Sequence, residues 1–341
     1  MYFWLVGLHK ASRYCLFDRT LQSAMLLLIA ALAPRPSWAC ATCGCTLNAD
    51  AAMGYSAEAG WRLSLEYDYI HQDQLRNGMH AVAAVPHGNE LERETLNRYL
   101  TLGVDYNPTA DWNIDLRVPY VVRTHSTYGP YDSTQPLPPI SSSRSSSAGD
   151  LRLIGAYQGF LPMHNLGLQL GVKLPTGQYG TEVKFDGGPA AGTPLDASLQ
   201  PGTGSTDIIL GAYYYRYVGL NMDAFANIQF QSALTSKQDR PGQDFRPGNA
   251  TTLSFGVRYG ADPKWVPQLQ MNLTHKSVDQ GALADLTDSA GYVAYVSPGL
   301  TATVFGGMHV YGFAQLPVYS DLVGYQVFPR YTLSVGASYA F

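Results

Sequence analysis

Three cysteines near the N-terminal end are the residues of this sequence with the clearest capacity for chemistry. Cys40, Cys43 and Cys45 fall within six positions, and no further cysteine follows them. Three thiolates at this spacing could bind a soft metal ion such as Cu(I) or Zn(II), or serve a redox partner. In an oxidising compartment Cys40 and Cys43 could instead form a disulfide and leave Cys45 over, and lipidation of Cys40 would leave two thiols. Apart from this metal ion, no cofactor is expected.

Histidines offer a second kind of chemistry, but they do not form an enzyme motif. His71, His125 and His275 fall near the expected outer ends of strands. A closed sheet could bring them together there, although chance placement is the simpler explanation. The sequence contains no nucleophile elbow, phosphate-binding loop, zinc-protease motif or pair of catalytic carboxylates in a known pattern. We therefore do not expect an enzyme.

Charged residues recur at every second position of several segments, and this spacing indicates the elements that must hold them. Between Trp61 and Tyr69 the odd-numbered positions are aromatic or aliphatic, and the even-numbered positions are polar or charged. Successive side chains of a β-strand point to opposite faces of the sheet. The segment therefore predicts a strand with one apolar face and one polar face.

The same alternation recurs in twelve runs, which predict an all-β fold. They cover residues 60–72, 94–106, 112–123, 149–158, 165–174, 206–217, 221–231, 251–259, 265–275, 291–304, 309–316 and 330–341. The connections between them are alternately long, as at 124–148, and short, as at 107–111. Transmembrane β-barrels show this alternation, because their external loops are long and their periplasmic turns are short. The sequence therefore predicts a transmembrane, antiparallel, up-and-down β-barrel of outer-membrane type with twelve strands over residues 60–341.

The polar positions of these runs are predicted to line the lumen. The pore-lining candidates are Arg62, Glu66, Asp68, Asp105, Asp115, Arg117, Arg123, Arg152, Lys173, Asp207, Asp223, Gln229 and Arg258. Both signs of charge are present, so strong selection for one ion charge is not indicated. The same residues could pair across the lumen and only stiffen the wall. Twelve strands lie between the small barrels that side chains fill and the wide porins, so a narrow pore is expected.

Two long connections have compositions that disfavour regular structure. Residues 124–148 are rich in Pro and Ser, and residues 175–205 are rich in Gly and Pro. Such segments suit exposed loops, which we expect outside the cell. One of them could fold inward and narrow the lumen, but the sequence does not say which.

The first 39 residues have the features of a secretory signal peptide. Three basic residues precede ten apolar residues at 24–33, and a small-residue cleavage pattern ends at Ala39. Ten apolar residues are too few to span a bilayer. Cleavage after Ala41 is the alternative. The expected organisation is a signal peptide (1–39), a periplasmic segment that contains the cysteines (40–59) and the barrel (60–341).

The two ends of the barrel are expected on the same side of the membrane. An even number of strands returns the chain to its starting side, which is the periplasm in proteins of this kind. The last run ends on Phe341, and a terminal aromatic residue on an alternating strand looks like the signature by which the assembly machinery recognises outer-membrane barrels. We expect a location in the outer membrane of a Gram-negative bacterium, in contact with its lipid.

Composition excludes several other classes of protein. Charged residues make up 14% of the chain, against about 25% in typical soluble domains. No apolar run long enough for a membrane helix occurs beyond the N-terminal region, which argues against a helical transporter. Without residues 1–39 the net charge is −7, and no basic patch is evident, so a nucleic-acid partner is not expected.

Four short segments of the predicted barrel are 149–153 (GDLRL), 173–177 (KLPTG), 202–207 (GTGSTD) and 314–319 (AQLPVY). Together they resemble blocks of a family of outer-membrane proteins named for the meta-pathway of phenol degradation. The resemblance extends over most of the predicted barrel and implies a barrel that takes up small, often aromatic, compounds. The leading hypothesis is a channel or transporter for small solutes, including hydrophobic or aromatic ones. The alternatives are an envelope protein whose barrel anchors the metal- or redox-linked cysteine segment, and a structural barrel with an occluded lumen.

Overall fold

The structure is a computed structural model that describes residues 47, 58–82, 91–129 and 138–341. All of them belong to the second of the two units into which the chain divides, Trp38–Phe341. The predicted signal peptide lies outside the described residues, and so do Cys40, Cys43 and Cys45. Among the described residues no helix is long and apolar enough to cross a membrane.

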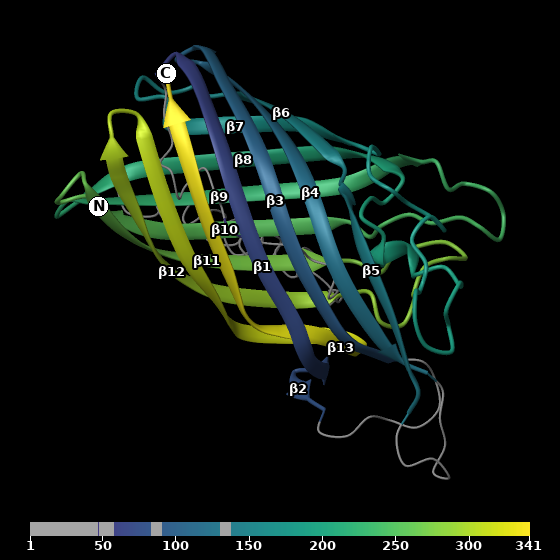
Figure 1. The fold of residues 1–341 in the computed structure, drawn as a ribbon. Coiled ribbons are helices and arrows are strands. Elements are labelled where there is room, and N and C mark those ends of the chain that lie inside the picture. Colours follow the sequence, from purple (N-terminus) through teal and green to yellow (C-terminus); the bar gives the residue numbers. More distant parts are fainter. Residues whose placement is uncertain (1–46, 48–57, 83–90, 130–137) are drawn as a thin grey trace, which may run out of the picture. The chain divides into compact units, whose positions relative to one another are not determined.

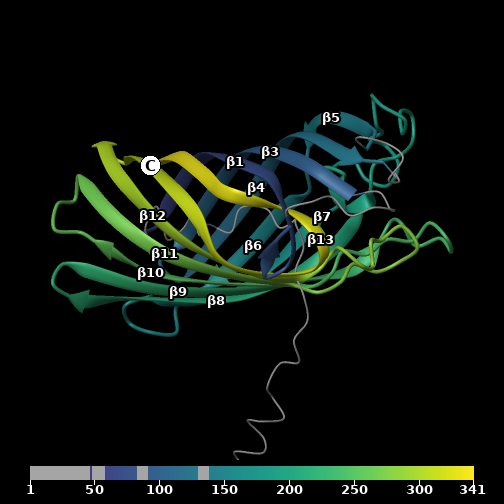
Figure 2. The same ribbon diagram turned by 90° about the horizontal axis from the view of Figure 1, so that it is seen from below.

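In the described part of the chain, thirteen strands form one antiparallel sheet that closes on itself (Figure 1). Eleven of them form the ring: β1 (Gly60–Gly78), β3 (Leu91–Thr109), β4 (Trp112–Tyr128), β6 (Leu151–Tyr157), β7 (Leu166–Leu174), β8 (Ser205–Gly219), β9 (Met222–Ser236), β10 (Ala250–Tyr259), β11 (Trp265–Lys276), β12 (Gly291–Phe305) and β13 (Met308–Ala340). The ring closes because β13 pairs with β1 (Figure 2). In this pairing Arg62 lies opposite Ala340. Two strands lie outside the ring: β2 (His80–Ala81) pairs with β1, and β5 (Ile140–Ala148) pairs with β4.

The ring contains eleven strands, whereas the sequence analysis predicted twelve. The difference lies in β13, a continuous strand of 33 residues that contains both of the last two predicted runs. Residues 308–322 of β13 pair with β12, and residues 322–340 pair with β1. The two halves lie beside each other, since the Ala340 amide donates to the Gly307 carbonyl oxygen at 2.9 Å. Gly324, with φ +61°, lets the chain fold back between the halves, a conformation that costs glycine little.

Part of the predicted loop 124–148 is regular strand. β4 continues to Tyr128, and the serine-rich β5 pairs with it from Ile140 to Ala148. The expectation of an irregular loop was therefore wrong for this segment. A strand outside the ring needs only backbone partners and not a continuous apolar face, and β4 supplies the hydrogen bonds along its edge.

The two faces of the sheet have opposite character, and the apolar face points outward. On β1, Leu65 is 48% exposed, whereas Asp68 on the opposite face is 3% exposed. Soluble proteins bury their large apolar side chains, and a contiguous exposed apolar surface marks contact with lipid or with a partner. Aromatic pairs lie at one end of the ring, with Trp61 stacked on Tyr106 at 4.2 Å between ring centres. An apolar outer surface with aromatic residues at its border is typical of barrels embedded in a membrane.

Candidate functional site

The inward face of the sheet encloses a cavity of about 490 Å³. Seven of the thirteen predicted pore-lining residues line it: Glu66, Asp68, Asp115, Arg117, Arg152, Lys173 and Gln229. The other six are not among its lining residues: Arg62, Asp105, Arg123, Asp207, Asp223 and Arg258. Of these, Asp223 and Arg258 lie opposite each other on β9 and β10. Alternation marked polar positions of the sheet but could not tell which of them border the cavity.

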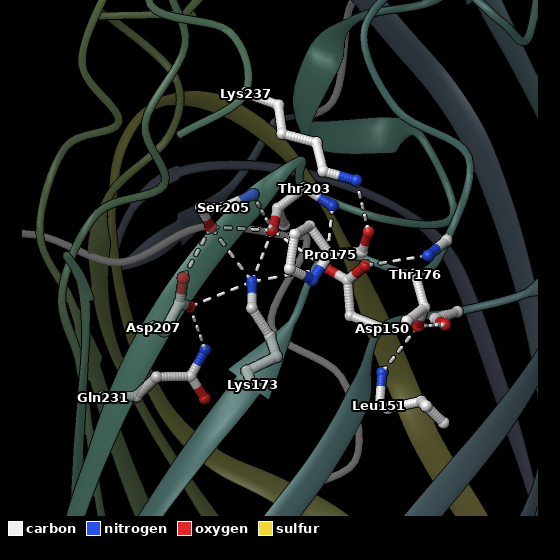
Figure 3. A network of polar contacts seen from close by, with 12 residues as sticks. Asp150, Leu151, Lys173, Pro175, Thr176, Thr203, Ser205, Asp207, Gln231 and Lys237 are labelled. Atoms are coloured by element: carbon white, nitrogen blue, oxygen red, sulfur yellow. Dashed lines mark hydrogen bonds and ion pairs between the residues drawn. The ribbon is translucent and has the colours of Figure 1, made fainter. Parts of the chain in front are cut away.

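Lys173, near the end of β7, lies at the centre of a buried polar network (Figure 3). Its Nζ atom lies 2.9 Å from Asp207 Oδ2 and 3.4 Å from Asp150 Oδ2. The same ammonium donates to Ser205 Oγ at 3.2 Å and to Thr203 Oγ1. Lys173 is only 4% exposed. A buried charge is tolerated only when it is paired and hydrogen-bonded, and both conditions are met here.

The two carboxylates of this network tie loops to the strands. Asp150, just before β6, accepts from the backbone amides of Gly177 at 3.1 Å and Thr203 at 2.9 Å. Asp207, on β8, accepts from Gln231 Nε2 on β9 at 2.6 Å. The network therefore links the connections that follow β5, β7 and η1 to the lumen-facing side of strands β6, β7, β8 and β9.

Three of the four segments that carry the family resemblance meet in this network. GDLRL supplies Asp150, KLPTG supplies Lys173, and GTGSTD supplies Thr203, Ser205 and Asp207. Sequence reasoning had named Lys173 and Asp207 as lumen residues but missed Asp150, Thr203 and Ser205. The three residues could have been found from their membership of the quoted segments. Strand alternation does not mark Asp150 and Thr203, which lie in loops, or Ser205, which is the first residue of β8.

Two glycines let the network close. The backbones of the KLPTG and GTGSTD segments touch at Gly177 and Gly202. A Cβ atom on Gly177 would lie 2.9 Å from the Gly202 Cα atom, and one on Gly202 would lie 2.8 Å from the Gly177 carbonyl carbon. Both approaches are too close for any side chain. The glycines thus bring Asp150, Thr203 and Lys173 within hydrogen-bonding distance.

A second group of charges lies on β1, β3 and β4. Arg117 Nε lies 2.8 Å from Asp115 Oδ1, and its Nη2 atom lies 3.5 Å from Asp105 Oδ1. Asp105 also faces Arg62, at 3.5 Å, and Arg117 donates to Ser64 Oγ at 3.3 Å. These residues pair with one another along the wall, between neighbouring strands and not across the lumen.

Arg152 lies between the two charged groups. It is opposite Arg117 on β4 and opposite Lys173 on β7. Unlike its two neighbours, Arg152 is exposed, and it lines the cavity. Within the described residues it makes no hydrogen bond and no ion pair.

The connection between β7 and β8 folds inward over the cavity. Val183, Phe185, Leu195 and Leu199 form a small apolar cluster in it, and the 3-10 helix η1 (Ala197–Leu199) belongs to this cluster. Ser198, Pro201 and Thr203 from the same connection line the cavity. This is therefore the inward loop that the sequence could not identify. Its buried apolar residues correct the expectation that it is simply an exposed loop.

Two polar side chains fix this inward loop. Gln200 Nε2 donates to the carbonyl oxygens of Val183 at 3.0 Å and Leu195 at 2.9 Å, and Gln200 Oε1 accepts from the Val183 amide at 2.9 Å. Arg123, on the lumen face of β4, donates to the carbonyl oxygens of Leu199 and Gln200. Arg123 thus acts as an anchor for the loop.

Aromatic side chains occupy another part of the lumen. Tyr311 and Phe313 of β13 are buried and pack against Leu47, which also lines the cavity. The Tyr311 hydroxyl donates to Glu66. The Tyr311 ring lies where a side chain at Gly336 would be, so this glycine makes room for the aromatic ring. The wall of the lumen therefore offers apolar as well as charged surface.

The three histidines near the strand ends have separate partners. His71 Nε2 lies 2.7 Å from Glu94 Oε1, and His125 Nδ1 lies 2.8 Å from Thr95 Oγ1. His275 stacks on Tyr292 at 4.5 Å. Across the described part of the chain, no group of three His, Cys, Asp or Glu side chains could hold a metal ion. The cysteine cluster lies outside that part.

In structure the chain is similar to an outer membrane channel from Pseudomonas putida F1. The TM-score is 0.58 at 13% sequence identity, and the match covers 83% of this chain and 96% of that one. The toluene transporter TbuX of Ralstonia pickettii matches with a TM-score of 0.45 at 10% identity, covering 83% of this chain and 90% of that one; this likeness is too low to support an argument. No protein-family model matches the chain, and no curated protein matches it either. The first match shows the fold, a closed antiparallel β-barrel, and confirms the fold that the resemblance implied.

Proposed function

We propose that the chain is a channel of the Gram-negative outer membrane that passes small solutes, hydrophobic and aromatic ones among them. One observation carries the proposal: a closed sheet with an apolar outer face and a polar inner face encloses a cavity of about 490 Å³. Binding cavities for small molecules commonly measure about 300–1,000 Å³. A structural barrel with an occluded lumen would not need such a space.

The lining of the cavity supports a mixed, partly apolar solute. Val121, Ile154 and Phe245 border it together with the charged residues. We assign the lining of the passage to the seven predicted residues that border the cavity. In this proposal Arg62, Asp105 and Asp207 neutralise neighbouring charges, Arg123 anchors the inward loop, and Asp223 and Arg258 line the lumen beyond the cavity.

The orientation in the membrane is part of the proposal. Residues 1–39 are a signal peptide that is removed, residues 40–59 lie in the periplasm, and both ends of the barrel face the periplasm. Exposed apolar side chains of the strands contact outer-membrane lipid. Phe341, which is exposed and stacks on Tyr339, is the residue that the assembly machinery contacts.

Single-channel recording in planar bilayers tests the channel function. We expect discrete current steps from the wild-type protein and larger steps from Arg123→Met, because this variant loses the donors that hold the loop carbonyls of Leu199 and Gln200. Uptake of a small aromatic solute into proteoliposomes should likewise be greater for Arg123→Met than for the wild type. A refolded barrel that gives no steps in either form, and no uptake, would overturn the proposal in favour of an occluded barrel.

A further inference from the structure

Arg152 is the charged residue of the cavity that the wall leaves most accessible. Its side chain points to the lumen side of β6, because the neighbouring Leu153 is exposed on the apolar outer face. It borders the cavity. Among the described residues it has no hydrogen-bond or ion-pair partner, whereas Arg117 and Lys173 on either side of it each have at least two.

The three carboxylates that act electrostatically on Arg152, those of Asp115, Asp150 and Asp207, are already engaged. Asp115 pairs with Arg117 at 2.8 Å. Asp150 and Asp207 share Lys173, and each accepts further hydrogen bonds from Thr203 or Ser205. If one of these carboxylates rotated toward Arg152, it would lose these contacts. The guanidinium group is therefore available to an acceptor from outside the protein.

Apolar side chains lie next to this cation. Ile154 is the next lumen-facing residue on β6, and it borders the same cavity as Pro119, Val121 and Pro201. The last three come together at Gly149, where a Cβ atom would lie 3.1 Å from Pro119, 3.3 Å from Val121 and 3.4 Å from the Pro201 carbonyl oxygen. One cavity thus offers a cation and, beside it, an apolar surface.

We propose that Arg152 binds the carboxylate of a small solute whose apolar or aromatic body lies against Pro119, Val121 and Ile154. The inference rests on the proposed channel function and names the class of solute. A planar guanidinium matches a carboxylate in shape and can donate two parallel hydrogen bonds to it. A dianion such as phosphate would need a second available cation, and Arg117 and Lys173 are occupied by carboxylates of the wall.

Binding of benzoate to the purified full-length protein in detergent, measured by titration calorimetry, tests this site. Benzamide, with the same ring but no charge, and acetate, with the charge but no ring, are the comparison ligands. The variants are Arg152→Gln and Arg152→Lys. The matched control is Arg216→Gln, since Arg216 is exposed on β8 and does not border the cavity.

We expect the wild type to bind benzoate more tightly than benzamide or acetate. Arg152→Gln should weaken benzoate binding at least about tenfold, the scale of a lost charge-assisted hydrogen bond, and leave benzamide unchanged. Arg152→Lys should recover part of the loss, and Arg216→Gln should change nothing. Equal benzoate binding by wild type and Arg152→Gln, or equal binding of benzoate and benzamide by the wild type, would overturn the inference.

The result is separable from the test of channel function. If the wild type conducts but binds benzoate independently of Arg152, the carboxylate site is wrong and the channel stands. If benzoate binds through Arg152 and neither the wild type nor Arg123→Met conducts, the site stands and the channel function is wrong.

Discussion

The Lys173 network and the cavity wall at Arg152 lie one strand apart, and they use the same kind of residue in opposite ways. Lys173 on β7 and Arg152 on β6 face each other in register, both on the lumen side of the sheet. Loop residues close over Lys173, which contacts Asp150, Thr203, Ser205 and Asp207. Within the described part of the chain, no loop residue forms a hydrogen bond or an ion pair with Arg152. Burial, and not position in the strand, therefore decides whether a lumen cation holds the wall together or is available to a solute.

The largest effect should follow from removing the Lys173 charge. Lys173→Met leaves the buried Asp150 and Asp207 without their ion-pair partner, and breaking a buried ion pair costs about 3–5 kcal/mol. We expect the free energy of unfolding, measured by urea titration of the barrel in vesicles, to fall by this amount. The loops that meet at Asp150 should also become sensitive to protease.

A double variant sharpens this result. In Lys173→Met/Asp207→Asn one of the two unpaired carboxylates is removed. Part of the lost free energy of unfolding should therefore be recovered. Full additivity of the two substitutions would show that Lys173 and Asp207 do not interact energetically, because contacting residues couple in such cycles. That outcome would contradict the network as drawn in Figure 3.

A smaller effect should follow from Gly177→Ala. The added Cβ atom would lie 2.9 Å from the Gly202 Cα atom, and backbone must move to admit it. Overpacking of this kind typically costs about 1–3 kcal/mol. Gly306→Ala is the matched control, because no atom lies within 4 Å of the Cβ position there. Equal unfolding free energies for the two variants would refute the close crossing of the two loops.

The same contrast explains how much of the molecule the sequence could predict. An apolar outer face and a polar inner face require the alternation at positions 61–69, so β1 and the polar face that carries Arg62, Glu66 and Asp68 could be predicted from the sequence. Asp223 and Arg258 were placed on the lumen face by the same pattern, and they do lie opposite each other. The serine-rich strand β5 could not be predicted from the sequence, because its formation depends on pairing with the edge of β4.

The inward loop could not be identified for a related reason. Its position depends on Arg123, which is 76 residues away in sequence from Leu199, and on Gln200, whose bonds go to the loop's own backbone. Neither contact follows a period of two or any local motif. The last two predicted runs, 309–316 and 330–341, are likewise joined in β13, because residues between them pair with β12 and β1.

A hydroxyl within the Lys173 network should contribute less than the charge. Thr203→Val keeps the shape of the side chain but removes the Oγ1 atom that donates to Asp150 Oδ2 at 2.9 Å and accepts from Lys173. Asp150 keeps its bonds from two backbone amides, so we expect a loss of about 1 kcal/mol. The control is Thr206→Val, one strand position beyond Ser205. If both valine variants unfold alike, Thr203 does not take part in the network.

The smallest effect on stability should come from Arg152 itself. Arg152→Met removes an exposed cation that forms no hydrogen bond or ion pair with a described residue, so the free energy of unfolding should stay within about 0.5 kcal/mol of the wild type, as for most exposed substitutions. The neighbouring Lys173→Met measures what the same kind of change costs where the charge is enclosed. A loss at Arg152 as large as that at Lys173 would mean that Arg152 also holds the wall. The difference between the two lumen cations would then disappear, and with it the basis for a solute carboxylate at Arg152.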